Sequence, residues 1–387
     1  MTRKAFVYLF YIFFMLTCSF WMGGCASPYQ EDAVDTLQEI PLSHAKGFKI
    51  FQGEGYKIIE VSQAFPGSHQ PFRYLILEDA QAEYPESNYS ASIQLPAESV
   101  IVTSTTHIPH LDLLHETDKL IGFPNLDLIS SQQARKMIEQ HQVRDLGRGA
   151  HTNIEIIIDL QPDWVMISTL GEDLKNLDLL QAAGIPAVIN GEYVEQDPLG
   201  RAEWIKLTGA LFGKLEEATS IFEEIEKDYL QAENLAEQIE ESKKPTVMAG
   251  VMYKDVWYVP GSDSWGAKLL NAAGGRYLFQ DQGGTGSVQL NYEYVLDQAQ
   301  EADYWLGASD YPSLSAMGIS DKRYADFNAF QQGNVYSYTL RKGPTGGIEY
   351  FELGYMRPDL ILKDLIQILH PELLPDYQLY FYTRLDE

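Results

Sequence analysis

Three histidines are the residues of this chain best suited to bind a metal ion. His107 and His110 lie three positions apart, which would place both imidazoles on one face of a helix, and His151 follows in a later loop. Neutral imidazoles bind zinc, manganese or haem iron. The alternative is that these histidines only form hydrogen bonds near the start of a helix, and the sequence leaves both interpretations open.

A second group of residues could bind an organic ligand through charge and aromatic surface. Arg148 and Arg341 each lie in a glycine-containing loop after a predicted strand, where a guanidinium could bind carboxylate or catecholate oxygens. Aromatic side chains would add buried area, although in a chain that is 12% aromatic each of them could equally belong to the core. The predicted ligand-binding residues are Thr106, His107, Arg148, Tyr253, Trp257, Trp265 and Arg341.

The motifs of several common enzyme classes are missing from the sequence. It contains no Gly-x-Ser-x-Gly elbow and no His-Glu-x-x-His, and the glycine-rich segment 283–286 is not followed by Lys-Ser or Lys-Thr. We therefore expect a protein that is not an enzyme and has no bound cofactor. A hydrolase built on paired carboxylates stays open in so acidic a chain.

Alternating strands and helices on both sides of one helical stretch must position these candidates. Apolar runs at 99–103 and 164–167 predict buried parallel strands in a first lobe, and runs at 246–249 and 335–338 do so in a second. Ligands of open α/β sheets bind beyond the carboxyl ends of the strands. We predict an α/β fold with two similar α/β lobes joined by a rigid helix, and a small N-terminal β appendage.

This pattern divides the chain into five segments. The helical stretch begins at Asp197-Pro198, an oxygen cap followed by proline at the first helical position, and Gly213-Lys214 predicts a break before a longer second helix. The predicted segments are a lipoprotein signal peptide (1–24), a tether and β appendage (25–98), an N-terminal lobe (99–196), a linking helix (197–213) and a C-terminal lobe (214–387).

An internal repeat supports the similarity of the two lobes. In the first lobe Asn153 is followed by Glu155, Asp159 and an Asp-aromatic pair at Asp163-Trp164. In the second lobe the same order occurs at residues 291, 293, 297 and 303–304, with two extra residues before the second Asp-aromatic pair. We interpret this as one helix–strand unit that is present in both lobes.

The first 25 residues have the pattern of a targeting segment. Arg3 and Lys4 precede an apolar run from Ala5 to Met22, and Gly23-Gly24-Cys25 follows. The pattern resembles the lipobox of bacterial lipoproteins, with Cys25 as the acylated residue and Met22 where leucine is usual. The alternative is a retained membrane anchor, because about 20 apolar residues can span a bilayer. Both interpretations place the remaining chain outside the cytoplasm.

Composition limits the remaining function classes. The two cysteines are Cys18 in the leader and Cys25 at its end, which would be acylated, so the mature chain would have no thiol for a disulfide or a thiolate metal site. The net charge of −27 argues against nucleic acid as a partner, because binding to phosphates needs basic patches.

The order and spacing of these motifs resemble one known family. From the lipobox through 99–107, 153–163 and the helix at Asp197, the order continues to 261–265, 273–275, 354–359 and 370–372. It is similar to the substrate-binding lipoproteins of ABC importers for iron–siderophore complexes, haem and cobalamin. The resemblance implies a ligand that is a metal–organic complex, held between two lobes that move little. It also implies delivery to an ABC permease and its ATPase from a periplasmic or extracytoplasmic, lipid-anchored position on the membrane.

Two positions of this sequence differ from the pattern of that family and leave the docking residues open. Proteins of that family often present an acidic residue on each lobe to the permease, and here those positions fall at Gln133 and Arg276, so docking could use other carboxylates such as Glu139 or Asp281.

Two alternatives to a chelate-binding function stay open. One is a zinc- or manganese-binding transport protein that uses His107, His110 and His151, and the other is a lipoprotein that binds a partner protein without a small ligand.

Overall fold

The computed structural model describes residues 37–387 except residues 69, 149–152 and 172–173. Residues 38–84 and 88–387 form one compact unit, which contains all the elements described below. The predicted signal peptide, Cys25 and His151 lie outside the described residues. Within the described part of the chain, no helix is both long and apolar enough to span a bilayer.

The β appendage is a five-stranded sheet with the order β1-β2-β3-β4-β5. Its strands are β1 (Gln38–Ile40), β2 (Phe48–Gln52), β3 (Tyr56–Val61), β4 (Phe72–Leu77) and β5 (Ala91–Gln94). Neighbours are antiparallel except β4 and β5, which are parallel. The predicted β appendage is therefore present.

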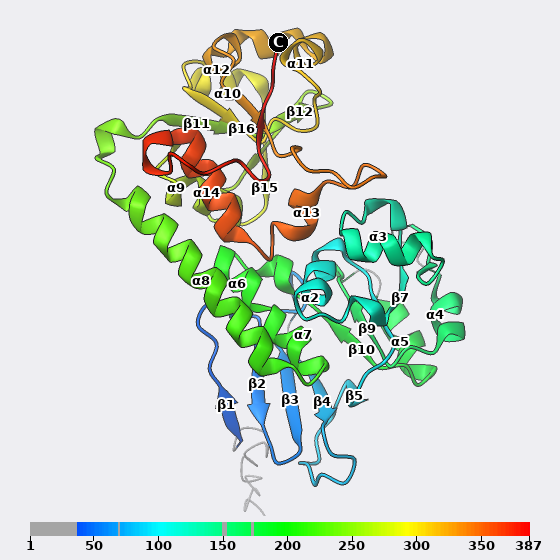
Figure 1. The fold of residues 1–387 in the computed structure, drawn as a ribbon. Coiled ribbons are helices and arrows are strands. Elements are labelled where there is room, and N and C mark those ends of the chain that lie inside the picture. The colour runs from blue at the N-terminus through cyan, green and yellow to red at the C-terminus, as the bar shows by residue number, and fades with distance from the viewer. Residues whose placement is uncertain (1–36, 69, 149–152, 172–173) are drawn as a thin grey trace, which may run out of the picture. The chain divides into compact units, whose positions relative to one another are not determined.

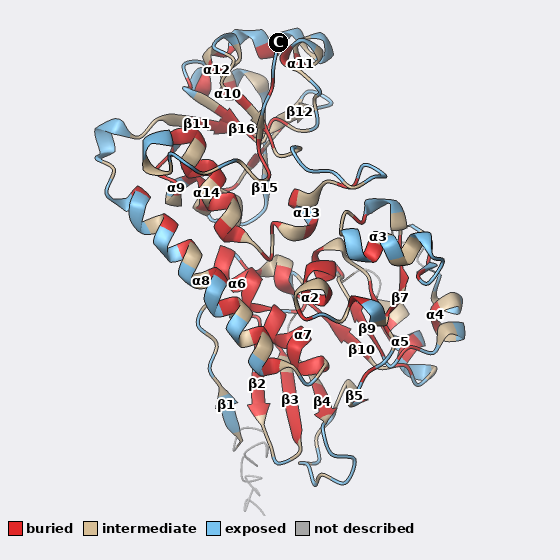
Figure 2. Ribbon diagram, viewed as in Figure 1, coloured by how far each residue is buried: buried red, intermediate tan, exposed pale blue. Residues whose placement is uncertain are grey.

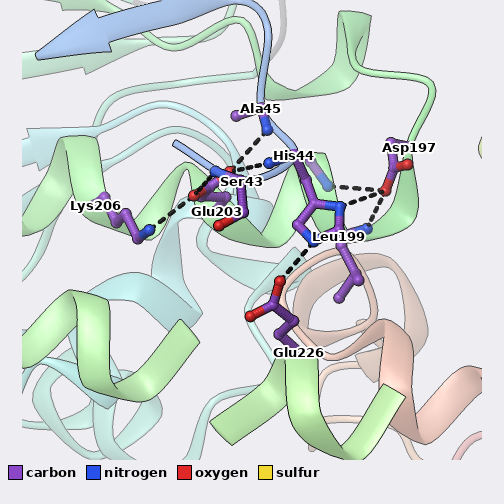
Figure 3. A network of polar contacts seen from close by, with 9 residues as sticks. Ser43, His44, Ala45, Asp197, Leu199, Glu203, Lys206 and Glu226 are labelled. Atoms are coloured by element: carbon purple, nitrogen blue, oxygen red, sulfur yellow. Dashed lines mark hydrogen bonds and ion pairs between the residues drawn. The ribbon is translucent and has the colours of Figure 1, made fainter. Parts of the chain in front are cut away.

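Two carboxylates attach the chain before β2 to helices that follow the first lobe (Figure 3). Glu203 is fully buried, and its carboxylate accepts hydrogen bonds from the backbone N–H groups of residues 43–45 and from the ammonium of Lys206. His44 lies 2.6 Å from a carboxylate oxygen of Glu226. A buried charge needs several such partners. The segment before β2 is therefore fixed to two helices at once.

The first lobe contains a parallel sheet with the order β10-β9-β6-β7-β8. Its strands are β6 (Val100–Val102), β7 (Leu120–Phe123), β8 (Arg144–Asp145), β9 (Trp164–Ile167) and β10 (Ala187–Ile189). Its α-helices are α2 (Ile108–Leu113), α3 (Gln132–Glu139), α4 (Ile154–Leu160) and α5 (Leu174–Ala182). The central strand β6 is buried along its length and its neighbours β7 and β9 are mostly buried, as Figure 2 shows, because helices cover the sheet.

The second lobe contains a sheet with the order β14-β11-β16-β17-β18, in which β18 alone runs antiparallel to its neighbour. Its strands are β11 (Thr246–Ala249), β14 (Arg276–Tyr277), β16 (Tyr304–Leu306), β17 (Val335–Ser337) and β18 (Thr383–Arg384). A smaller antiparallel sheet is formed by β12 (Val251–Tyr253), β13 (Val256–Pro260) and β15 (Ser287–Leu290). The α-helices are α9 (Trp265–Ala272), α10 (Tyr292–Ala299), α11 (Leu314–Ser320), α12 (Asn328–Gln331), α13 (Glu349–Leu353) and α14 (Pro358–Leu369).

The two lobes share a four-stranded core, which confirms the predicted fold of two similar lobes. The order β7-β6-β9-β10 of the first sheet matches β14-β11-β16-β17 of the second. The repeated residues have the same tasks in each lobe. Asn153 caps α4 and Asn291 caps α10. The carboxylate of Asp163 accepts a hydrogen bond from the backbone N–H of Ser99, just before β6. The carboxylate of Asp303 accepts one from the backbone N–H of Thr246, at the start of β11.

Three helices follow the first lobe: α6 (Pro198–Glu203), α7 (Ile205–Leu211) and α8 (Leu215–Glu237). The predicted cap at Asp197 is present, and the predicted break lies at Gly213, whose φ of +71° is costly for other residues. A Cβ on Gly209 would lie 2.5 Å from that of Ala218, so glycine lets α7 and α8 pack closely. Helix α8 begins in the core of the first lobe with Leu215 and continues into the core of the second (Figure 1).

Candidate functional site

An opening lies beyond the carboxyl ends of β6, β7 and β9 in the first lobe. It is a cavity of about 700 Å³ that extends between the sheet and helices α4 and α5. Parallel sheets place ligand sites at this edge, because the loops diverge there and leave a crevice. The position therefore agrees with the rule used to select the candidate residues.

The walls of this cavity are mainly apolar, and its polar groups come from the segments that follow the strands and from Asn176 on α5. The main apolar lining residues are Phe123, Leu128, Ile154, Ile157, Val165, Ile167, Leu170, Leu174, Leu177, Leu180 and Ile189. The polar lining residues are Thr103, Ser104, Thr105, Asn125, Ser168, Thr169 and Asn176. Among the described residues that line it, none is charged. Leu170 is 68% exposed and Leu128 is 50% exposed, so two large apolar side chains are open to water at this site.

The equivalent edge of the second sheet has much less space. Its cavity measures about 140 Å³ and lies beside Tyr338, Tyr350 and Tyr382. The rings of Tyr338 and Tyr350 stack with centroids 4.9 Å apart, and Tyr382 packs edge-on against Tyr350. These tyrosines occupy the volume that is open in the first lobe.

The histidines lie in a buried polar cluster beside the first cavity. His107 and His110 are each 1% exposed, and both face the carboxylate of Glu192 at 3.9 and 3.6 Å. The Nδ1 atom of His110 lies 2.8 Å from the hydroxyl of Thr208. Neither ring nitrogen of His107 has a hydrogen-bond partner in the described part of the chain. The predicted shared face is thus present, with Glu192 as an acidic neighbour that the sequence did not indicate.

Burial controls the charge of this cluster. It lowers the pKa of His107 well below its ordinary value and that of His110 to about 3, so both imidazoles are neutral at pH 7. It also raises the pKa of Glu192 to about 7, although a hydrogen bond from Thr106 and the charge of Arg201 act in the opposite direction. Thr106 is itself buried, so it supports the cluster.

Trp265 lies between the lobes and contacts a cation that was not predicted. The guanidinium of Arg201, on α6, lies 4.9 Å from the ring centroid of Trp265 and 4.5 Å from that of Tyr355. The same side chain donates hydrogen bonds to the carbonyl groups of Tyr193 and Glu195 in the first lobe. Arg201 is therefore held by both lobes, and Trp265 is partly covered by it.

A second contact between the lobes is formed by residues 341–348 and helix α13. The carboxylate of Glu352 is buried and accepts the backbone N–H groups of Ser130 and Ser131, at the start of α3. The hydroxyl of Thr345 donates to the carbonyl of Asp127 at 2.7 Å. A Cβ on Gly347 would lie 2.2 Å from the carbonyl oxygen of Leu128, so this contact requires glycine. Burial raises the pKa of Glu352 to about 7 against these two hydrogen bonds.

The two predicted arginines lie beside this contact, outside the lining of the cavity. Arg148 is 74% exposed in its side chain and pairs with Asp127 at 3.1 Å. Arg341 is exposed, its guanidinium covers the ring of Tyr380 at 4.1 Å, and its Nε donates to the carbonyl of the same residue. Both cations are thus near the place where the lobes meet.

The structure corrects the expected position of Trp257. It is fully buried in the second lobe, where its ring packs against Trp305, Tyr324 and Phe327 and its Nε1 donates to the carbonyl of Ala249. The alternation of β13 directs this side chain into the core. Tyr253 is 61% exposed at the end of β12, beside the ammonium of Lys254. The predicted aromatic residues therefore do not form one wall.

No group of three or more His, Cys, Asp or Glu side chains among the described residues has a geometry that could hold a metal ion. The predicted docking positions Gln133, on α3, and Arg276, in β14, are both exposed.

The apolar lining is the part of the site that the sequence analysis missed. Thr105 and Thr169 follow predicted strands, so the strand-end rule could reach them. The leucines and isoleucines of α4 and α5 have the spacing of ordinary core positions, and no pattern separates those that line a cavity from those that fill one.

Comparison with known proteins finds a matching family model and relatives that are named lipoproteins. A family model described as periplasmic binding protein matches residues 100–341. An uncharacterized lipoprotein of Methanocaldococcus jannaschii is 29% identical over 301 residues, which cover 76% of this chain and 70% of the relative. A second uncharacterized lipoprotein of that organism is 23% identical over 365 residues, which cover 88% of this chain and 86% of that relative.

Solved structures agree in fold. A possible iron-binding, periplasmic solute-binding protein from Staphylococcus epidermidis has a TM-score of 0.54 at 18% identity, covering 71% of this chain and 99% of that chain. The periplasmic haem-binding protein of Vibrio cholerae has a TM-score of 0.55 at 16% identity, covering 71% of this chain and all of that chain, 100%. At these identities the likeness shows the fold alone.

Proposed function

Because the chain belongs to the periplasmic binding protein family, we propose that it captures a small ligand outside the cytoplasm and delivers it to the permease and ATPase of an ABC importer. The observation that carries this proposal is the cavity of about 700 Å³ at the carboxyl edge of the first sheet, next to the contact with the second lobe. A cavity of this size suits an organic molecule, since a bare ion would fill only a small part of it.

We propose a metal–organic complex as the ligand, of the iron–siderophore, haem or cobalamin type. Arg148 and Arg341 support this, because both guanidinium groups lie near the contact between the lobes, where they could reach anionic oxygens of a chelate. Each Arg→Ala variant should then weaken binding about ten- to a hundredfold, since a charge-assisted hydrogen bond contributes about 1.5–3 kcal/mol.

Native mass spectrometry of protein from cells supplied with iron or cobalamin tests the proposal. It should show a bound organic ligand, and titrations of ferric chelates, haem and cobalamin followed by tryptophan quenching should then rank the candidates. Unchanged affinity in both Arg148→Ala and Arg341→Ala would contradict the proposed role of the arginines. Failure of every organic ligand to bind would contradict the proposed ligand class.

A zinc or manganese ion is the second candidate, and it is favoured by the buried ring of His107, whose nitrogens have no hydrogen-bond partner among the described residues. With His110 and His151 it would supply nitrogen ligands, and the carboxylate of Glu192 lies beside two of the three. Under this hypothesis zinc binds without an organic chelator, and His107→Ala abolishes this binding. Under the chelate hypothesis His107→Ala changes the affinity little.

We also propose that the mature protein is lipid-anchored through Cys25. Two relatives that are named lipoproteins support this, together with the leader sequence. Cys25→Ser should release the protein from the membrane fraction, and a variant that stays acylated and membrane-bound would refute the anchor.

A further inference from the structure

We propose that the cavity of the first lobe binds an uncharged aliphatic chain of the ligand, so that the transported molecule is amphiphilic. The inference rests on the proposed binding function and adds the chemistry of the group that enters the first lobe. It starts from the distribution of polar and apolar groups in one cavity of about 700 Å³.

The cavity has hydroxyl groups at the strand ends and apolar walls. Ser104, Thr105 and Ser168 follow the carboxyl ends of β6 and β9, so their hydroxyl groups lie at the sheet edge. Further in, the walls come from β9 and β10 on one side and from Ile157 and Leu177 of α4 and α5 on the other. A charged group would lose its hydration in that interior without finding a partner among the described lining residues.

The shape of the apolar group follows from the types of side chain. Among the described lining residues Phe123 is the one aromatic side chain, and it is only 1% exposed. A planar macrocycle would therefore find little to stack on, whereas methylene groups gain as much from leucine and isoleucine as from aromatic walls. The aliphatic lining thus favours an alkyl or acyl chain over a flat ring.

The exposed leucines at the mouth support the same conclusion. Leu170 and Leu128 are large apolar side chains that are more than half or half exposed, and both line this cavity. A chain that passes between them would remove this surface from water, and the gain in affinity would grow with the number of methylenes buried. The polar head of the ligand would then lie at the mouth, near Asn125 and the exposed Arg148.

A chain-length experiment on the full-length protein tests this inference with neutral N-alkylmaleimides as probes. Two cysteines are introduced into the same molecule, Ser168→Cys at the cavity and Ser220→Cys on the exposed side of α8. Mass spectrometry then reports the ratio of alkylation at residue 168 to that at residue 220 for methyl, butyl, hexyl and octyl probes. Because both sites are on one molecule, membrane partitioning of the probes cancels in the ratio.

The ratio should rise with chain length, by at most about fourfold for each methylene that is fully buried and at least about tenfold from methyl to octyl. A maleimide with a hexanoate tail should lose this advantage, because its carboxylate cannot enter the apolar interior. A ratio that does not depend on chain length, or is equal for the hexyl and hexanoate probes, overturns the inference.

Matched variants on α5 locate the effect. Leu174 lines the cavity, whereas Leu179 on the same helix is 53% exposed and does not line it. Leu174→Asp should abolish the dependence on chain length, and Leu179→Asp should leave it intact. Asn176→Asp also places a charge in the lining with almost no change in size, so it gives the same test if Leu174→Asp does not fold. Equal behaviour of lining and control variants refutes the proposed site.

The outcomes separate this inference from the proposed function. A rise with chain length in a protein that carries no transported ligand would contradict the importer function and keep the apolar site. A co-purified chelate in a protein without any chain-length effect would keep the importer function and remove the aliphatic chain.

Discussion

The two sheets present equivalent edges with opposite content. The strand order β7-β6-β9-β10 of the first lobe matches β14-β11-β16-β17 of the second, and asparagine caps and aspartate hydrogen bonds occupy matching places. At the carboxyl edge, however, the first lobe has a cavity of about 700 Å³ and the second has about 140 Å³.

Side-chain volume explains this difference. The core of the second lobe is built around large rings, with Trp257, Trp305 and Phe327 in mutual contact. Tyr350 of α13 and Tyr382, just before β18, line its small cavity. The first lobe has leucine, isoleucine and valine in the corresponding layer. The shared backbone therefore determines where a site can lie, and the local side chains determine which lobe has room for a ligand.

The largest expected effect concerns the filled lobe. Trp257→Ala should lower the free energy of unfolding by about 3–5 kcal/mol, because it removes a buried ring and leaves a cavity in the aromatic cluster. Urea unfolding followed by circular dichroism measures this. Tyr253→Ala on the adjacent strand is the control, since an exposed residue should change the stability by less than about 0.5 kcal/mol. Similar effects of both variants would mean that the second lobe is not packed around Trp257.

The next prediction concerns the pH dependence of the open lobe. Burial raises the pKa of Glu192 to about 7 in the folded chain, above its ordinary value of 4.5. The folded state therefore holds a proton that the unfolded state has lost. The stabilisation is complete below about pH 4.5 and is lost as the pH rises through about 7, by roughly 3 kcal/mol in total.

Comparing wild type with Glu192→Gln isolates this contribution. His107, His110 and Arg201 face the same carboxyl group and remain in both proteins. As the pH rises from 5 to 8, the free energy of unfolding of the wild type should fall relative to that of Glu192→Gln. At the equivalent edge of the second lobe, burial raises the pKa of Tyr338, so this side chain should not titrate in this range. Glu352 on α13, whose pKa burial raises to about 7, is present in both proteins, so its contribution cancels in the difference. A constant difference across this range would show that Glu192 is solvated.

A smaller effect tests the repeated framework. Asp163 accepts hydrogen bonds from two backbone N–H groups and a hydroxyl before β6, and Asp303 accepts one of each at β11. Asp163→Ala and Asp303→Ala should each lower the free energy of unfolding by about 1–2 kcal/mol. Asp159→Ala, at an exposed position of α4, should change it by less than about 0.5 kcal/mol. A loss in one lobe alone would break the equivalence of the two units.

Much of this framework could be predicted from the sequence, because it depends on local patterns. The runs at 99–103, 164–167, 246–249 and 335–338 identified β6, β9, β11 and β17, and the Asn–Glu–Asp spacing identified the repeated unit. The family predicted from the order of these motifs is confirmed. Short elements such as β14 and α13 were not predicted, because two to five residues give no periodicity. Strand β15 was not predicted either, because its neighbours in the sequence are polar.

The site could be predicted only as far as the sheet edge. The strand-end rule placed Thr106 and His107 near it, but packing between distant segments determined the rest. Trp257 entered the core through the register of β13, and Glu192 and Glu352 became buried through contacts more than 80 residues away in sequence. Such pairings are decided by tertiary packing, which no local pattern reports.

The smallest expected effect is the change in the angle between the lobes when ligand binds. Helices α6 and α7 contribute Leu199 to the core of the second lobe and Leu207 to that of the first, and α8 spans both cores. A rotation would have to separate packed side chains of a continuous helix, which costs far more than turning a loop hinge. Arg201 and Glu352 add polar contacts between the lobes. Small-angle scattering with and without ligand should therefore give radii of gyration that agree within error. A large closure on ligand addition would show that these helices act as a hinge, and that the two lobe edges come together only in the bound state.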